Sequence, residues 1–177
     1  KYDPQFGENR QMKHTIMIDE RSIAERVASL AEQICNDYKG KQIALVAVSN
    51  GAFIFAADLF RKLPHDTYFD SVKASSYKAA KRGELVLKET FNIDLNGKHV
   101  LLVDDILDSG VTLSNIAKYL ESLGTCVMLD KPEGRVCDFH ADYIGFTIPN
   151  RYVYGYGMDD EFGLLRGCPY IGAKEEE

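Results

Sequence analysis

The chain has 177 residues, of which 45% are hydrophobic and 27% charged, and it carries a formal net charge of −6 at pH 7. The acidic balance argues against a nucleic-acid partner, which needs clustered Lys and Arg, and no apolar run approaches the ~20 residues that span a membrane. We therefore expect a cytoplasmic protein of one domain, whose four widely spaced Cys form neither a zinc site nor a disulfide framework.

Strands and helices alternate in the first half of the chain. A helix is predicted after the capping residue Asp19, because apolar residues recur at helical spacing between Ile23 and Ile34. The continuous apolar run Ile43–Val48 is typical of a parallel strand covered on both faces. In chain order, we predict a strand at 15–18, the helix from Asp19 to Gly40, the strand at 43–48, a turn at 49–51 and a helix at 52–62 ended by Leu63-Pro64.

The second half continues this alternation. Apolar residues at i, i+3, i+4 and i+7 from Leu113 predict a helix that stops at Gly124. The pattern changes beyond Asp130, where the expected strands are short and aromatic. The predicted elements are strands at 67–76, 85–91, 100–103 and 126–129, a helix from the turn at 109–112 to Gly124, and strands at 143–146 and 152–156. Their order predicts an α/β fold with a doubly wound parallel sheet.

The most informative stretch is Val100–Leu113. A buried strand ends in two adjacent carboxylates, Asp104 and Asp105, and a third acid, Asp108, precedes a small turn at 109–112 that opens a helix. Where a helix begins, unpaired N–H groups and the helix dipole favour an anion. The glycine in this turn lets the backbone come close to a ligand, and its hydroxyls add donors. The turn therefore suits a phosphate.

Three carboxylates beside a phosphate site would repel the ligand unless a divalent cation lay between them. Mg²⁺ binds carboxylate, hydroxyl and phosphate oxygens and is therefore the expected cofactor. The same residue types also occur as ordinary helix caps and turn residues. A ligand site is favoured because strand, acids, turn and helix follow in order, and ligands of open α/β sheets bind at the carboxyl ends of strands.

This stretch resembles the phosphoribosyl-pyrophosphate signature of the type I phosphoribosyltransferases. Three further motifs are similar to those of the hypoxanthine-guanine phosphoribosyltransferases: Ser76-Tyr77, Asp130-Lys131 and the segment Ile148–Asp159. Their order and spacing match across nearly the whole chain. The resemblance implies a single domain with a twisted parallel sheet flanked by helices. Its core would span about 19–130, and a small hood would be formed by segments 1–18 and 131–177.

The resemblance also implies a purine salvage enzyme. With Mg²⁺, it would transfer the phosphoribosyl group of phosphoribosyl pyrophosphate to N9 of a 6-oxopurine, hypoxanthine and/or guanine, giving IMP or GMP and pyrophosphate. Asp108 would act as the general base for purine N7, and Asp104 and Asp105 would hold the ribose hydroxyls directly or through the metal. The 5′-phosphate would be bound by the turn residues Ser109, Gly110, Val111 and Thr112.

Two loops would complete the phosphoribosyl-pyrophosphate site. The residues Ser49-Asn50-Gly51 by themselves are typical of an ordinary turn. By resemblance they form the diphosphate loop, with a cis Ser49–Asn50 bond that exposes the N–H groups of Asn50 and Gly51. Many relatives have Lys at the position of Asn50, so the backbone rather than this side chain is expected to bind. By resemblance, Ser76 and Tyr77 lie on a mobile loop that closes over the reacting centre and excludes water.

The base pocket follows from the chemistry of a 6-oxopurine, which needs a donor at its carbonyl oxygen, a backbone acceptor and an aromatic face. Taken alone, Lys131 is typical of an exposed loop lysine and Tyr152 of a core aromatic. By resemblance, Lys131 donates to the 6-oxo group, Tyr152 stacks on the ring, and Val153 contributes backbone hydrogen bonds. Asp159 would bind a second Mg²⁺, and Arg166 would contact the diphosphate.

Other functions stay open at this point. Hypoxanthine, guanine and xanthine differ at C2, where the motifs supply only backbone, so a xanthine-preferring transferase is an alternative. A second alternative is a non-catalytic regulator that senses phosphoribosyl pyrophosphate, but to bind nucleic acid it would need a basic face. Members of the family are usually oligomers, so a homo-oligomer, either dimer or tetramer, is expected.

Overall fold

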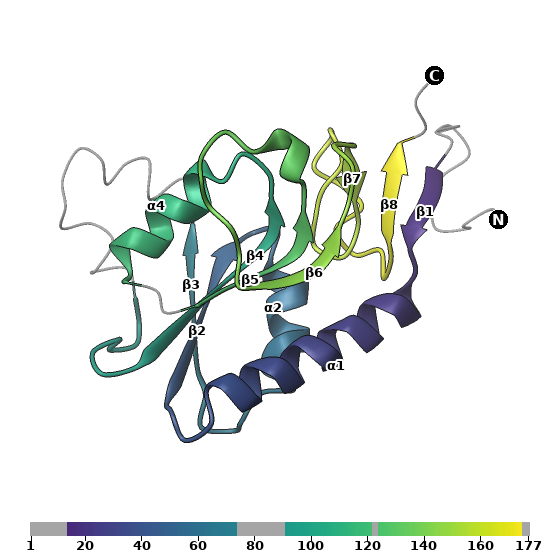
Figure 1. Ribbon diagram of the computed structural model, residues 1–177. Coiled ribbons are helices and arrows are strands. Elements are labelled where there is room, and N and C mark those ends of the chain that lie inside the picture. Colours follow the sequence, from purple (N-terminus) through teal and green to yellow (C-terminus); the bar gives the residue numbers. More distant parts are fainter. Residues whose placement is uncertain (1–13, 74–90, 122–123, 175–177) are drawn as a thin grey trace.

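The computed structural model describes residues 14–73, 91–121 and 124–174, which build two sheets (Figure 1). The larger sheet has five parallel strands in the order β3-β2-β4-β5-β6, and the smaller has three strands in the order β1-β8-β7. The elements are β1 (His14–Ile18), α1 (Glu20–Asp37), β2 (Ile43–Ser49), α2 (Phe53–Phe60), β3 (Tyr68–Lys73), β4 (His99–Leu107), α4 (Val111–Tyr119), β5 (Gly124–Asp130), the 3-10 helix η2 (Pro132–Gly134), β6 (Tyr143–Thr147), β7 (Val153–Tyr154) and β8 (Ile171–Lys174). The predicted parallel sheet between helices is confirmed.

Helices cover both faces of the large sheet, which explains the continuous apolar runs of its strands. Successive residues of a strand point to opposite faces. On β2, Leu45 therefore packs into the core that α1 and α2 share, whereas Val46 packs into the second core beneath α4. On β4, Leu101 and Leu102 divide between the two cores in the same way.

The helix α1 begins as the sequence predicts. The carboxylate of Asp19 accepts a hydrogen bond from the Ser22 N–H at 2.8 Å, which satisfies one of the donors left unpaired at a helix start. Its buried stripe contains Ile23, Val27, Leu30, Ala31 and Ile34.

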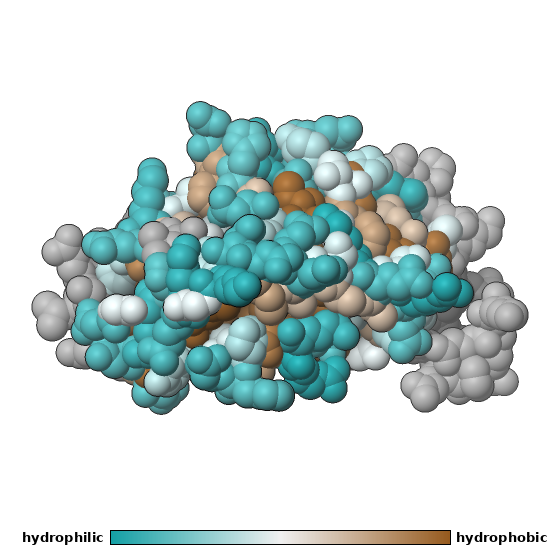
Figure 2. Space-filling model, turned by 60° about the horizontal axis from the view of Figure 1, so that its bottom comes forward, coloured by the Kyte–Doolittle hydropathy of each residue, from teal (hydrophilic) through white to brown (hydrophobic). Residues whose placement is uncertain are grey.

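On the face of the molecule shown in Figure 2, hydrophilic side chains predominate. No helix in the described stretches is long and apolar enough to cross a membrane.

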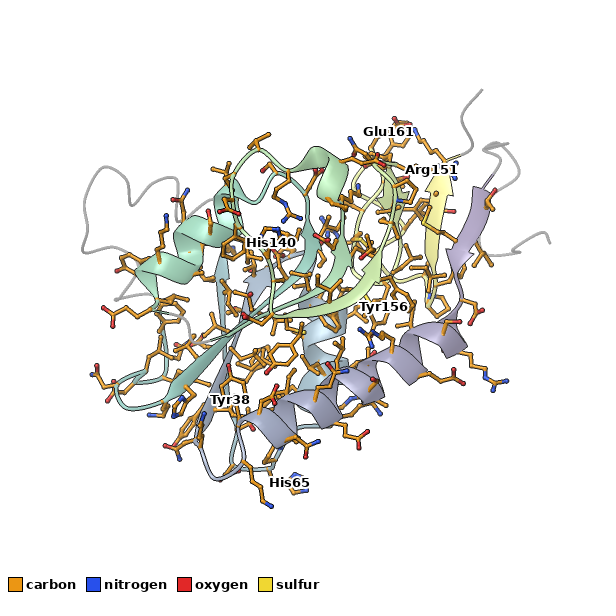
Figure 3. All side chains as sticks on the ribbon, viewed as in Figure 1. Tyr38, His65, His140, Arg151, Tyr156 and Glu161 are labelled. Atoms are coloured by element: carbon orange, nitrogen blue, oxygen red, sulfur yellow. The ribbon has the colours of Figure 1, made fainter. Side chains whose placement is uncertain are left out.

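The small sheet joins the two ends of the described chain. Strand β1 pairs antiparallel with β8, and β8 pairs antiparallel with β7, so the sheet stands beyond β6 at one end of the molecule (Figure 1). Tyr156, which is labelled in Figure 3, lies in the loop after β7. Its hydroxyl donates to the Asp58 carboxylate of α2 at 2.8 Å and so connects this loop to a helix of the large sheet. The hairpin around residue 156 is thereby held against α2.

Several predicted boundaries were wrong. The helix expected to stop at Gly124 ends at Tyr119, because Glu121 adopts a left-handed φ of 49°. Gly124 instead begins β5, where the Tyr38 hydroxyl leaves no room for a side chain. The strand expected at 67–76 begins at Tyr68, and its residues 74–76 lie outside the described residues, as does most of the strand expected at 85–91.

Candidate active site

The cleft that holds the predicted site lies where the strand order reverses. Strand β4 pairs with β2 only as far as Val103, but with β5 as far as Leu107. Strands β2 and β4 therefore separate at their carboxyl ends, and a cleft of about 280 Å³ opens between them. Its walls include Ser49 at the end of β2 and Gly51 after it, and Asp104 to Gly110 with Thr112 beyond the last β2–β4 pair. Asp104 and Asp105 thus lie on an extended β4, not beyond a strand that ends at residue 103 as predicted, whereas Asp108 follows the last residue of β4.

The acid pair occupies the floor of this cleft. Asp104 is buried and Asp105 half-buried, and the Asp105 N–H donates to the Asp104 carboxylate at 2.9 Å. Burial, and then the neighbouring Asp105 charge, raise the pKa of Asp104 well above its ordinary value. Two carboxylates in this position favour a cation or several hydrogen-bond donors in the cleft.

The loop after β2 packs directly on Asp105. The Ser49–Asn50 peptide bond is cis, which confirms the prediction. A Cβ placed on Gly51 would lie 1.8 Å from Asp105 Oδ2, so this position has no room for a side chain. On its other side, a Cβ on Gly157 would lie 2.1 Å from the Gly51 carbonyl oxygen. The loop is therefore enclosed between β4 and the hairpin that follows β7.

We expect Gly51→Ala to lower kcat/KM by about 100-fold, because the methyl group would displace either the loop or the Asp105 carboxylate. Gly167→Ala is the matched control, since a Cβ there meets no atom within 4 Å. Steady-state kinetics and a thermal melt of both variants check this prediction. Activity of Gly51→Ala within threefold of the Gly167→Ala value would show that the close packing is unimportant.

The turn after β4 has the geometry of an anion site. Gly110 adopts a φ of 81° and caps α4, whose first residue is Val111. The Ser109 hydroxyl accepts a hydrogen bond from the Val111 N–H at 3.4 Å. Thr112 lines the cleft, and Asp108 is exposed at its edge. The four residues predicted to bind phosphate are therefore brought together at one helix start beside the acids.

Lys131 follows β5 and reaches the same region. Its side chain is buried, and Nζ donates to the carbonyl oxygen of Arg151 at 2.7 Å. Burial lowers the pKa of Lys131, while the nearby charges of Asp108 and Asp105 act in the opposite direction. The lysine is thus not an exposed loop residue, and its ammonium group lies near two of the three acids.

The remaining predicted residues lie directly before, in and after β7. Tyr152 is 48% exposed, and its hydroxyl donates to the Asp159 carbonyl oxygen at 3.2 Å. Val153 is buried in the core. Arg166 forms an ion pair with the Asp159 carboxylate at 2.5 Å and also donates to the Gly157 carbonyl oxygen at 2.7 Å. Asp159, the predicted ligand of a second metal ion, and Arg166, the predicted diphosphate contact, are therefore paired with each other.

Comparison with known proteins identifies the family. A family model described as the phosphoribosyl transferase domain matches residues 15–161. The chain belongs to this phosphoribosyl transferase family. The hypoxanthine-guanine phosphoribosyltransferase of Aquifex aeolicus is 39% identical over 96% of this chain and 99% of its own length. The hypoxanthine phosphoribosyltransferase of Salmonella typhimurium is 41% identical over 91% of this chain and 96% of its own.

A solved structure places the fold within the same phosphoribosyl transferase family. The crystal structure of a hypoxanthine-guanine phosphoribosyltransferase from Bacillus anthracis is similar with a TM-score of 0.81 and 38% sequence identity. The match covers 92% of this chain and 98% of that one. The resemblance and the type I fold inferred from the sequence are confirmed.

Some residues of this phosphoribosyl transferase site were missed or are not described. Ser76 and Tyr77 lie outside the described residues. Sequence reasoning missed Gly134, where a Cβ would lie 1.8 Å from Asp108 Oδ1, and Arg135, whose Nε donates to the Asp108 carbonyl oxygen at 2.8 Å. The loop between β5 and β6 has no periodicity that could have revealed them. The only local signal was their closeness to Lys131.

Proposed function

We propose that this phosphoribosyl transferase is a purine salvage enzyme that uses hypoxanthine and/or guanine. It transfers the phosphoribosyl group of phosphoribosyl pyrophosphate to purine N9 and releases pyrophosphate. The main support is the buried Lys131 ammonium beside the acids and the phosphate turn, because it joins a donor for a 6-oxo group to a phosphoribosyl site. The names of the Aquifex and Salmonella relatives support the same substrates.

The phosphate-bearing end of the substrate is held by backbone groups. Ser109, Gly110, Val111 and Thr112 bind the 5′-phosphate with N–H groups and hydroxyls at the start of α4. The N–H groups of Asn50 and Gly51 bind the diphosphate on the other side of the cleft. Together, these contacts orient the ribose between them, and orientation supplies a large part of the rate in a reaction with little covalent chemistry for the protein.

Asp108 accepts the proton from purine N7 as N9 bonds to the ribose. It stands at the edge of the cleft, one residue before the phosphate turn, and near the Lys131 ammonium. Lys131 donates to the 6-oxo group, Val153 contributes backbone hydrogen bonds, and the half-exposed ring of Tyr152 stacks on the purine. An amino group at C6, as in adenine, would leave the ammonium without an acceptor on the base.

Mg²⁺ fits the acid pair, because the donors are hard carboxylate oxygens and a cation would offset both the burial and the neighbouring Asp105 charge that raise the pKa of Asp104. Asp104 and Asp105 would hold it together with ribose hydroxyls, and Asp159 would bind a second ion. When bound, Mg²⁺ neutralises the charge that develops on the diphosphate. Because Arg166 is paired with Asp159, its move to the diphosphate and metal binding by Asp159 would occur together.

The wider organisation is also proposed. Residues of about 19–130 would form the core, and segments 1–18 and 131–177 would form a hood over the base; 1–13, 74–90, 122–123 and 175–177 lie outside the described residues. Closure by the segment that carries Ser76 and Tyr77 stays a prediction. We also propose a cytoplasmic location. A homo-oligomer, dimer or tetramer, is supported by the exposed aromatic side chains of Tyr68 and Phe69 on β3 at the end of the large sheet.

The proposal is tested by nucleotide formation from phosphoribosyl pyrophosphate and Mg²⁺ with hypoxanthine, guanine, xanthine and adenine in parallel. We expect IMP or GMP, no product from adenine, and no turnover after the metal is removed with a chelator. Turnover of xanthine alone would identify a xanthine-preferring transferase. Binding of phosphoribosyl pyrophosphate without turnover of any base would identify a regulator.

A further inference from the structure

The loop between β5 and β6 is bonded to the phosphate turn along three consecutive carbonyl groups. Arg135 Nη2 donates to the Leu107 carbonyl oxygen at 3.2 Å, and Arg135 Nε donates to the Asp108 carbonyl oxygen at 2.8 Å. The Val136 N–H donates to the Ser109 carbonyl oxygen at 3.1 Å. Arg135 therefore contacts the peptide groups on both sides of Asp108.

The guanidinium of Arg135 is itself held firmly. It forms an ion pair with the Asp130 carboxylate at the end of β5, and Nη1 donates to the Phe139 carbonyl oxygen. The side chains of Arg135 and Asp130 are each only 12% exposed. All three guanidinium nitrogens are thus engaged within the protein, which suits the rigid fork of donors that Arg presents. No guanidinium nitrogen is left to donate to a substrate, so the group acts on the site through the backbone that it holds.

These bonds decide which groups of the turn face a ligand. In a trans peptide the carbonyl and the N–H point in opposite directions. Because the carbonyls of Leu107, Asp108 and Ser109 point to the β5–β6 loop, the N–H groups that follow them point away from it. The cleft walls include Asp108, Ser109 and Gly110, whereas Arg135 is not among the described residues that line it. An anion in the cleft therefore meets N–H donors rather than carbonyl oxygens.

We propose that Arg135 is a positioning residue for the phosphoribosyl site, which fixes the N–H donors for the 5′-phosphate and the backbone of Asp108. The inference rests on the proposed function, because that function places a 5′-phosphate at this turn. The fit is close, since a Cβ on Gly110 would lie only 2.8 Å from Arg135 Cδ. Any displacement of the guanidinium would therefore reach the turn directly.

The test compares two ligands that occupy opposite sides of the cleft. Isothermal titration calorimetry measures the Kd of IMP, which carries the 5′-phosphate, and the Kd of magnesium pyrophosphate, which does not. We expect Arg135→Gln to weaken IMP binding by about 10- to 100-fold, because misplaced groups carry costs of this order. The Kd of magnesium pyrophosphate is expected to change less than twofold. Equal losses for both ligands, or wild-type affinity for IMP, would overturn the proposal.

The variant Arg135→Lys distinguishes the effect of the positive charge from that of the fixed donor geometry of the guanidinium. An ammonium group keeps a positive charge beside Asp130 but cannot hold two carbonyls in fixed geometry. We expect Arg135→Lys to fold and to bind IMP as weakly as Arg135→Gln does. Full recovery of the IMP affinity would mean that charge alone matters, and would contradict a positioning role. If Arg135→Gln does not fold, the Arg135→Lys measurement decides.

Arg26→Gln is the matched control. Arg26 also donates to two backbone carbonyls, of Gly145 at 2.8 Å and of Ile144 at 2.5 Å, but it joins α1 to β6 away from the cleft. Its loss is expected to lower the Tm and to leave both Kd values unchanged. The proposed function is checked separately by the wild-type protein. If wild type binds neither IMP nor phosphoribosyl pyrophosphate, the proposed function fails before any variant is considered.

Discussion

Asp108→Asn is expected to lower kcat by about 10²- to 10⁴-fold, the usual contribution of a general base. The amide has nearly the shape of the carboxylate but cannot accept the proton from purine N7. The KM for phosphoribosyl pyrophosphate should change little, because the carbonyl of residue 108 keeps its bond to Arg135 and the phosphate turn is untouched. Steady-state kinetics with hypoxanthine and guanine measure both parameters.

Asp138→Asn provides the control for the lost negative charge. Its carboxylate lies in the same β5–β6 loop that braces the turn, but the side chain is 99% exposed. This variant should keep wild-type kcat and KM. A kcat for Asp108→Asn within threefold of wild type would exclude Asp108 as the base. A rise in KM without a fall in kcat would instead assign it to substrate binding.

Lys131→Gln is expected to lower kcat/KM for hypoxanthine and guanine by about 100-fold, because a charge-assisted hydrogen bond to the 6-oxo group is lost. In the same variant, the ratio of kcat/KM for hypoxanthine to kcat/KM for adenine should decrease. Unlike an ammonium, the Gln amide offers both a donor and an acceptor, so it can accept a hydrogen bond from a 6-amino group. Parallel measurement of kcat/KM for the three bases gives both results.

Lys98→Gln tests whether loss of any lysine has these effects. The Lys98 ammonium lies 4.6 Å from the centre of the Tyr68 ring. Lys98 directly precedes β4 and is not among the described residues that line the cleft. No change in base preference is expected there. If Lys131→Gln leaves the ratio of kcat/KM for hypoxanthine to kcat/KM for adenine unchanged, the buried ammonium does not distinguish the two bases. Its bond to Arg151 would then be structural alone.

Sequence motifs predicted the local geometry of the cleft. The turn at 109–112 and the acids before it line the cleft as expected, because their arrangement depends on neighbours within a few residues, and the cis Ser49–Asn50 bond agrees with the family resemblance. The ligands assigned to these residues stay proposals. The start of α1 at Asp19 was predicted for the same reason, since capping is a contact between residues three apart. The prediction that a helix ends at Gly124 was wrong because that position depends on a residue far away in the chain. A glycine is typical of both a helix end and a tight packing site, and only the Tyr38 hydroxyl against it distinguishes the two.

By itself, the sequence therefore determined the alternation of strands and helices, the phosphate turn and the acids beside it. Tertiary structure alone decided which distant residues complete the site. Gly157 packs on Gly51, and Arg135 holds the carbonyl of Asp108. Neither contact has a local pattern, because periodicity records which face of an element is buried but not what covers that face. The chemistry is encoded in short motifs, whereas its positioning depends on contacts between segments far apart in the chain.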